Sequence, residues 1–255
     1  MYPQSASLSL RQRASWLAHL FKAATQQHHT SLRPLFAPYI GRDAVVIDVG
    51  AHGGQFAKLF ARMAPAGEVY AFEPSVYARS VLIPAIGFNR LRNVKIVPLG
   101  LSDQPGERVL HTPIKGRSRL GYGIAHLGDK AEGERAEDQT VTVTTLDEFA
   151  RRRGLRRLDF IKADIEGWEL RALVGGETTL KRFQPPLFLE VDGRFLSRAG
   201  DTPGDLFDWL ANLGYSGFTS LELAPAPAYV GPGDYLFVAA NKPLISSRQC
   251  PIARG

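Results

Sequence analysis

The chain has 255 residues, of which 44% are hydrophobic and 22% are charged, and its formal net charge is +6. This composition is ordinary for a globular protein, and the length suits one large domain. A single cysteine, Cys250, excludes a disulfide framework or a cysteine-built zinc site and is typical of a reducing compartment. No apolar run reaches the roughly 18 residues of a membrane span, so the sequence predicts a cytoplasmic protein.

The N-terminal stretch predicts an amphipathic helix rather than a targeting peptide, because polar residues interrupt its apolar run and no small-residue cleavage site follows. The apolar stripe of this helix is formed by Trp16, Leu17, Leu20 and Phe21. We expect residues 1–40 to be a helical extension that covers the substrate or a dimer partner. A catalytic domain at 41–245 and a tail at 246–255 are expected to follow.

Short apolar runs then alternate with helical patterns. Strands are predicted at 44–50, 67–74, 93–103, 158–167 and 185–192, and helices at 54–64, 75–89 and 168–182. Apolar strands separated by helices predict an α/β fold with a doubly wound, seven-stranded, Rossmann-like sheet. Residues 215–224 and 233–242 are joined without room for a helix, which predicts an antiparallel strand pair at the end of the sheet.

Two segments are rich in arginine. Residues 111–140 read as irregular, and a loop of this length is typical of a lid, a binding loop or a solvated insertion. Within it, Arg117, Arg119 and Tyr122 are the candidates for recognising an anionic or sugar substrate. The run "ARRRGLRR" at 150–157 is predicted to be the exposed face of a short helix rather than a nucleic-acid patch.

The first predicted strand ends in a glycine-rich turn, "VVIDVGAHGGQF" at 45–56. The dinucleotide fingerprint G-x-G-x-x-G is not matched, because His52 occupies the position of its middle glycine. A carboxylate at Asp48 would repel a pyrophosphate but complements an ammonium group or the surroundings of a sulfonium. The turn therefore favours S-adenosylmethionine, with a tight turn of purely geometric purpose as the alternative. The candidate contacts are Asp48, Gly50, Ala51, His52 and Gly54.

Acidic and polar residues also end the next two predicted strands. Glu73 ends the second strand nineteen residues after Gly54, where a doubly wound sheet places an acid that binds ribose hydroxyls. Its alternative role is a charge at a helix N-terminus. At the end of the third strand, Leu101 is expected to pack on an adenine while Ser102 or Asp103 hydrogen-bonds to it.

These segments, together with "VYAFEP", "LGLSDQPG", "TTLDEFA" and "LDFIKADIEGWELRALVGG", occur in the order seen in the FkbM-type methyltransferases. The chain resembles that family over about residues 44–192. The family signature K-x-D-x-E-G-x-E is matched by Lys162, Asp164, Glu166, Gly167 and Glu169. The resemblance implies methyl transfer from S-adenosylmethionine to a hydroxyl of a natural product or sugar, with S-adenosylhomocysteine as product. His52 departs from the asparagine that is usual in the family.

Groups at the carboxyl ends of strands are where a doubly wound fold places its chemistry. Asp164 is the first candidate for the base or for a group that orients the substrate, and it is also a candidate cofactor contact. Glu166 is the second candidate for the base. Lys162 is interpreted as one half of a structural ion pair. Glu190 is expected to hydrogen-bond the substrate. Glu190 and Asp192 end the fifth strand and could hold a magnesium ion with a diol substrate. Because nothing sets three ligands at a convincing spacing, we predict no metal and keep magnesium as the alternative.

Other functions are kept open but disfavoured. An RNA ribose or cap methyltransferase is the rival enzyme, whereas base methylation is disfavoured because no N-P-P-Y-like turn follows the fourth strand. A non-catalytic nucleoside-binding module would need neither Asp48 nor Glu73, and an NAD-dependent oxidoreductase would need the missing glycine. The expected partner is a small-molecule or sugar hydroxyl acceptor. Nucleic acid is disfavoured, and a homodimer is left open.

Overall fold

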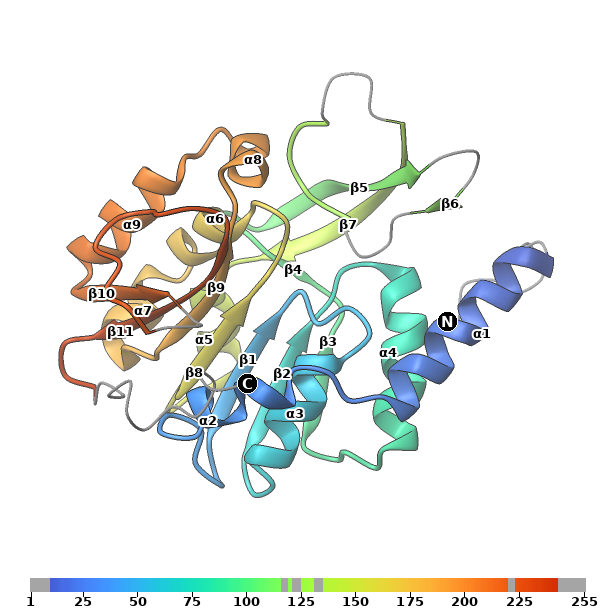
Figure 1. Cartoon of the computed structure of the whole chain (residues 1–255), viewed down its shortest axis with the longest axis horizontal. Helices are drawn as coiled ribbons and strands as arrows, with labels where there is room; N and C mark the ends of the chain where they lie inside the picture. The colour runs from blue at the N-terminus through green and yellow to red at the C-terminus, as the bar shows by residue number, and fades with distance from the viewer. Residues whose placement is uncertain (1–9, 116–118, 121–124, 131–134, 220–222, 243–255) are drawn as a thin grey trace.

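The structure is a computed structural model that describes residues 10–115, 119–120, 125–130, 135–219 and 223–242. Its centre is a seven-stranded sheet in the order β10-β11-β9-β8-β1-β2-β3 (Figure 1). The strands are β1 (Val45–Val49), β2 (Glu68–Phe72), β3 (Val94–Val97), β8 (Phe160–Ala163), β9 (Leu187–Val191), β10 (Tyr215–Thr219) and β11 (Gly233–Ala239). Only β11 runs antiparallel to its neighbours, which are β9 and β10. The predicted sheet and its antiparallel ending are confirmed.

Helices cover both faces of this sheet because side chains along its strands alternate between two apolar clusters. Val46 of β1 packs with one cluster, and Ile47 and Val49 pack with the other. The first face carries α2 (Arg33–Phe36), α3 (Gln55–Met63) and α4 (Val76–Phe88), and the second carries α5 (Leu146–Arg153), α6 (Glu169–Val174), α7 (Glu177–Phe183), α8 (Gly193–Leu196) and α9 (Pro203–Asn212). Within the described ranges, no helix is both long and apolar enough to cross a membrane.

A second sheet corrects two predictions. The predicted strand at 93–103 is divided: β3 ends at Val97, and β4 (Gly100–Leu101) joins a separate four-stranded sheet. The other members of that sheet are β5 (Gly106–Lys115), β6 (Arg119–Leu120) and β7 (Ala136–Thr144). Strands therefore occupy both ends of the segment that reads as irregular. In Figure 1 this sheet lies above the arrowheads of β1 and β2.

The long helix predicted at 168–182 is two helices, α6 and α7, because the chain is interrupted at Gly175 and Gly176. A Cβ at Gly175 would lie 2.0 Å from the Ser102 carbonyl oxygen, and one at Gly176 would lie 2.6 Å from Leu146 Cδ2. The two glycines thus allow a close approach that a longer helix would prevent. The arginine run at 150–157 includes the exposed end of α5, as predicted.

The N-terminal extension forms α1 (Leu10–Thr25), which packs across α4 (Figure 1). Trp16 Nε1 donates a hydrogen bond to Ser80 Oγ at 2.9 Å. The predicted apolar stripe is wrong in part, since Leu17 and Phe21 are exposed. A further anchor comes from Lys58 of α3, whose buried ammonium donates to two backbone carbonyls near the end of α1.

The close approach of β1 to β8 makes a prediction about Gly50. This residue has a φ of +77°, and an added Cβ would lie 2.1 Å from the Asp164 carbonyl oxygen. We expect Gly50→Ala to lower the free energy of unfolding by at least about 2 kcal/mol in urea titrations. Gly87→Ala is the matched control, because a Cβ there meets nothing within 4 Å in the interior of α4. Equal stability of the Gly50 variant and the wild type would contradict the observed strand spacing.

Candidate functional site

A cavity of about 240 Å³ lies at the carboxyl ends of β1, β2 and β8. The strand order reverses between β1 and β8, which is where open α/β sheets bind their ligands. The predicted site residues that line the cavity are Gly50, Ala51, His52, Glu73, Leu101, Asp164 and Glu166. Apolar side chains from the second sheet and the segment beside it, Leu110, Ala125 and Leu127, also line it.

The turn after β1 folds across the end of β2. The backbone N–H groups of Gly50 and Ala51 both donate to the Phe72 carbonyl oxygen at 3.0 Å. Gly54, the last predicted residue of this turn, is the N-cap of α3 at a φ of +83° and does not line the cavity. A Cβ at Gly54 would lie 2.6 Å from Leu82 Cδ1, so this glycine allows α3 to pack against α4.

Glu73 is 6% exposed and fastens two loops together. Its Oε2 accepts from the His52 backbone N–H at 2.8 Å, and its Oε1 accepts from the Ser75 backbone N–H at 2.8 Å. Burial raises the pKa of Glu73 to about 7. Each carboxylate oxygen can accept a second hydrogen bond, so donors inside the cavity remain acceptable partners.

Lys162 is buried between two carboxylates. Its Nζ lies 3.6 Å from Asp48 Oδ1 and 3.5 Å from Asp164 Oδ2. Burial opposes its positive charge, but Asp164 and Asp48 outweigh burial and raise the pKa of Lys162. The ion pair predicted for Lys162 is thus present, with two acids instead of one.

Asp48 itself does not line the cavity. The side chain is fully buried, and burial raises its pKa. Neither carboxylate oxygen has a hydrogen-bond partner within the part of the chain that the structure describes. Its nearest charge is the ammonium of Lys162, so the geometry offers a counter-ion beneath the site rather than the expected cofactor contact.

The ends of β8 and β9 bring together a cluster of acids. The carboxylate oxygens of Asp164, Glu166 and Glu190 lie within 4.8 Å of one another, which suits a divalent cation. The expectation that no three ligands converge is therefore wrong, because β8 and β9 are neighbours in the sheet. Asp192 is not part of the cluster: it pairs with Arg194 at 2.5 Å and caps α8.

The protonation states of these acids differ. Burial and the charge of Asp164 raise the pKa of Glu190 to about 9. Burial also opposes the charge of Asp164, but Lys162 and a hydrogen bond from Glu190 outweigh it and lower the pKa of Asp164. At neutral pH, Glu190 therefore holds a proton and Asp164 is ionised. Burial raises the pKa of Glu166 to about 7, although Arg198 lies 3.9 Å from its Oε2.

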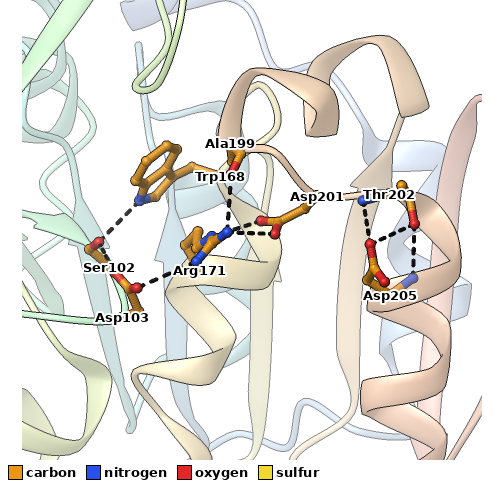
Figure 2. A network of polar contacts seen from close by, with 8 residues as sticks. All are labelled: Ser102, Asp103, Trp168, Arg171, Ala199, Asp201, Thr202 and Asp205. Carbon is orange, nitrogen blue, oxygen red and sulfur yellow. Dashed lines mark hydrogen bonds and ion pairs between the residues drawn. The ribbon is translucent and has the colours of Figure 1, made fainter.

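Ser102 and Asp103 lie outside the cavity lining, which includes their neighbour Leu101. Figure 2 shows them in a polar network that fastens β4 to α6. Trp168 Nε1 donates to Ser102 Oγ at 3.2 Å, and Ser102 Oγ donates to Asp103 Oδ1 at 2.9 Å. Arg171 continues this network from Asp103 to Asp201. The expected adenine contacts of Ser102 and Asp103 are not brought to the cavity.

The structure describes only some of the predicted substrate residues. Arg117 and Tyr122 lie outside the described residues. For Arg119 only the backbone is described, which pairs with Lys115 in the second sheet. Glu190 lies in the acid cluster.

The sequence interpretation missed His29, which lines the cavity from the N-terminal extension. Its ring stacks on Phe56 with centroids 4.4 Å apart. No motif surrounds His29, so only packing could reveal its place. Glu169 of the family signature has a structural role: its Oε1 accepts from the backbone N–H of Ile165 at 2.8 Å and of Gly167 at 3.3 Å, which shapes the turn after β8.

The acid cluster predicts a pH dependence of stability. Because the pKa of Glu190 is raised in the folded protein, its contribution is fully present below the pKa of the unfolded carboxyl and is lost as pH approaches about 9. We expect the melting temperature to fall between pH 7 and pH 9, and Glu190→Gln to lessen that fall. Glu177→Gln, an exposed acid of α7, is the control. An identical decline in the wild type and in Glu190→Gln would contradict the proton assigned to Glu190.

Comparison with known proteins gives a family match over residues 48–216, to the "Methyltransferase FkbM domain". Among curated proteins, "AMB antimetabolite synthetase AmbE" of Pseudomonas aeruginosa is 30% identical over 194 residues, which cover 64% of this chain and 9% of that protein. "2-O-methyltransferase NoeI" of Sinorhizobium fredii is 24% identical over 148 residues, which cover 55% of this chain and 60% of that protein.

Among solved structures, a methyltransferase FkbM from Methylobacillus flagellatus KT has 15% sequence identity and a TM-score of 0.45, with 88% of this chain and 59% of that chain covered. The chain thus spans less than two thirds of the length of each of these relatives. The family match covers more than half of the chain and includes the turn after β1, Glu73 and the end of β8. By this match the chain belongs to the FkbM methyltransferase domain family.

Proposed function

We propose that the protein transfers a methyl group from S-adenosylmethionine to a hydroxyl group of a small natural product or sugar. The observation that carries this proposal is the cavity at the β1–β8 crevice, with Glu73 at one wall and ionised Asp164 at another. Carboxylates suit ribose hydroxyls, an ammonium and a sulfonium, none of which is an anion. Among the lining residues that the structure describes, Lys162 is the one lysine or arginine, and such a lining is poorly suited to a pyrophosphate.

When bound, S-adenosylmethionine would supply an electrophilic methyl group. Glu73 would accept hydrogen bonds from the ribose hydroxyls, and Leu101 would pack against the adenine. Gly50, Ala51 and His52 would border the methionyl part, where a larger residue at position 50 would collide with β8. Leu110 and Leu127 would exclude water, which strengthens every polar contact inside the cavity.

Asp164 and Glu166 are the proposed acceptor-side acids. Methyl transfer is an in-line displacement, so most of the acceleration comes from holding the acceptor oxygen near the methyl group. Asp164, kept ionised by Lys162, would accept a hydrogen bond from the acceptor or from the cofactor ammonium. Protonated Glu190 would donate to an acceptor oxygen, and Glu166 would supply a further hydrogen-bond acceptor.

The same charges favour a neutral, hydroxylated acceptor. Ionised Asp164 and the acidic wall at Glu73 would disfavour a phosphate in the described part of the cavity, which disfavours RNA as the acceptor. O-methylation agrees with the name of NoeI as a 2-O-methyltransferase.

Calorimetric titration with S-adenosylhomocysteine tests this function. We expect micromolar binding by the wild type, and at least about tenfold weaker binding by Glu73→Ala, since a buried hydrogen-bond acceptor for the ribose is lost. Asp103→Ala is the matched control, because Asp103 lies outside the cavity lining. Its affinity should stay within about threefold of the wild type.

Circular dichroism must show each variant to be folded, since Glu73 also fastens two loops. NAD serves as the competing ligand. Binding of NAD, or no binding of S-adenosylhomocysteine by folded wild type, would contradict the proposal. Binding without methyl transfer to any hydroxylated acceptor in a broad panel would favour a non-catalytic nucleoside-binding module.

A further inference from the structure

The end of α1 and the residues that follow it, a segment from 23 to 29, are held against the catalytic domain. Lys58 Nζ donates to the carbonyl oxygens of Ala23 and Gln26, at 2.5 and 2.7 Å. The Gln55 side chain accepts from the His28 backbone N–H at 3.0 Å. Asn89 of α4 donates to a further carbonyl of the segment at 2.8 Å. These contacts from α3 and α4 direct the chain to the mouth of the cavity.

His29 is where this segment reaches the cavity. Its backbone has a φ of 61°, and its ring lies nearly parallel to that of Phe56, at an interplanar angle of 14°. The ring of Phe56 in turn lies 5.1 Å from Lys162 Nζ. His29, Phe56, Lys162 and Asp164 all line the cavity. Stacking on Phe56 therefore holds the imidazole on the side of the cavity where Lys162 lies.

Methylation of a hydroxyl requires a group that takes its proton, and the acids of the site are poorly suited to this. Asp164 is a weak base, because its ion pair with Lys162 lowers its pKa. Glu190 already holds a proton at neutral pH. Burial raises the pKa of Glu166 to about 7, which suits a base, but the Glu166 side chain is buried and its Oε2 lies 3.9 Å from Arg198. His29 is exposed at the mouth, where an acceptor must enter.

The electrostatic surroundings of His29 favour the neutral imidazole, which is the form that can accept a proton. Burial of part of the ring lowers the pKa of His29, and the charges of His28 and Lys162 lower it further, against the opposing charge of Asp164. The ring is therefore neutral at pH 7 and able to accept a proton.

We propose that His29 is a catalytic residue on the acceptor side of the site, contributed by the N-terminal extension, which lies outside the family match at 48–216. This inference rests on the proposed function. The acceptor oxygen forms a bond to the methyl carbon as the methyl–sulfur bond breaks. The electron pair of that bond stays on sulfur, and the hydroxyl proton passes to the imidazole of His29.

Nuclear magnetic resonance tests the placement without an acceptor. The imidazole of His29 is titrated in the complexes with S-adenosylmethionine and with S-adenosylhomocysteine, and His29→Gln assigns its signal. The two ligands differ by one methyl group and one positive charge. We expect a lower His29 pKa with S-adenosylmethionine, because a nearby sulfonium disfavours the imidazolium. The difference between the two complexes should be at least twice as large at His29 as at His28, the neighbouring control.

Kinetics test the role. With a hydroxyl acceptor found by screening, His29→Gln should lower turnover by about 100-fold while the affinity for S-adenosylhomocysteine stays within threefold. The His29→Gln substitution should also remove the acidic limb of the pH–rate profile. The control His28→Gln should leave the turnover and the pH–rate profile unchanged.

Two outcomes have different meanings. An equal His29 pKa in the two complexes, or unchanged turnover of His29→Gln, would overturn the role of His29 alone. If neither ligand binds the folded wild type, the proposed function fails, and the role of His29 fails with it.

Discussion

The ammonium of Lys162, buried at the centre of the sheet between Asp48 and Asp164, determines the character of the whole site. A lysine that is 2% exposed is tolerated only with carboxylate partners, since removal of one partner from a buried pair commonly costs about 3–5 kcal/mol. β1 supplies Asp48, β8 supplies Lys162, and Asp164 directly follows β8. This pairing therefore links the two strands that border the crevice and leaves Asp164 ionised. The raised pKa of Glu190 follows from its burial and then from that charge.

Close backbone approaches are a second requirement of the site. At Gly50 the turn after β1 meets the end of β8, and at Gly167 the turn after β8 meets the carbonyl oxygen of Phe195. The carboxylates of Glu73 and Glu169 then hold these turns through backbone N–H groups. The main walls of the cavity are thus set by contacts within the protein. A ligand that enters would find most of its polar partners already in position.

Periodicity and motif spacing predicted the main sheet and the residues at the ends of its strands, because strands that are buried on both faces have a clear apolar signature. The second sheet was missed because β5 has no regular alternation of apolar and polar residues and β7 begins with polar residues, so neither has the continuous apolar run of a strand buried on both faces. A motif also cannot show which way a carboxylate points, so Asp48 beneath the site and Glu73 beside the cavity looked alike. His29 reaches the site through packing of α1 and α3, which leaves no local pattern in the sequence.

The cavity lies between two sheets that are hydrogen-bonded separately. The short stretch from Val97 to Gly100 joins β3 of the main sheet to β4 of the second sheet, and the chain returns from β7 through α5 to β8. Substitutions or insertions in the connections between β5, β6 and β7 can therefore alter one side of the cavity without changing the register of β1, β2 and β8. In evolutionary terms, the choice of acceptor can diverge among relatives while the part that would hold the cofactor is kept intact.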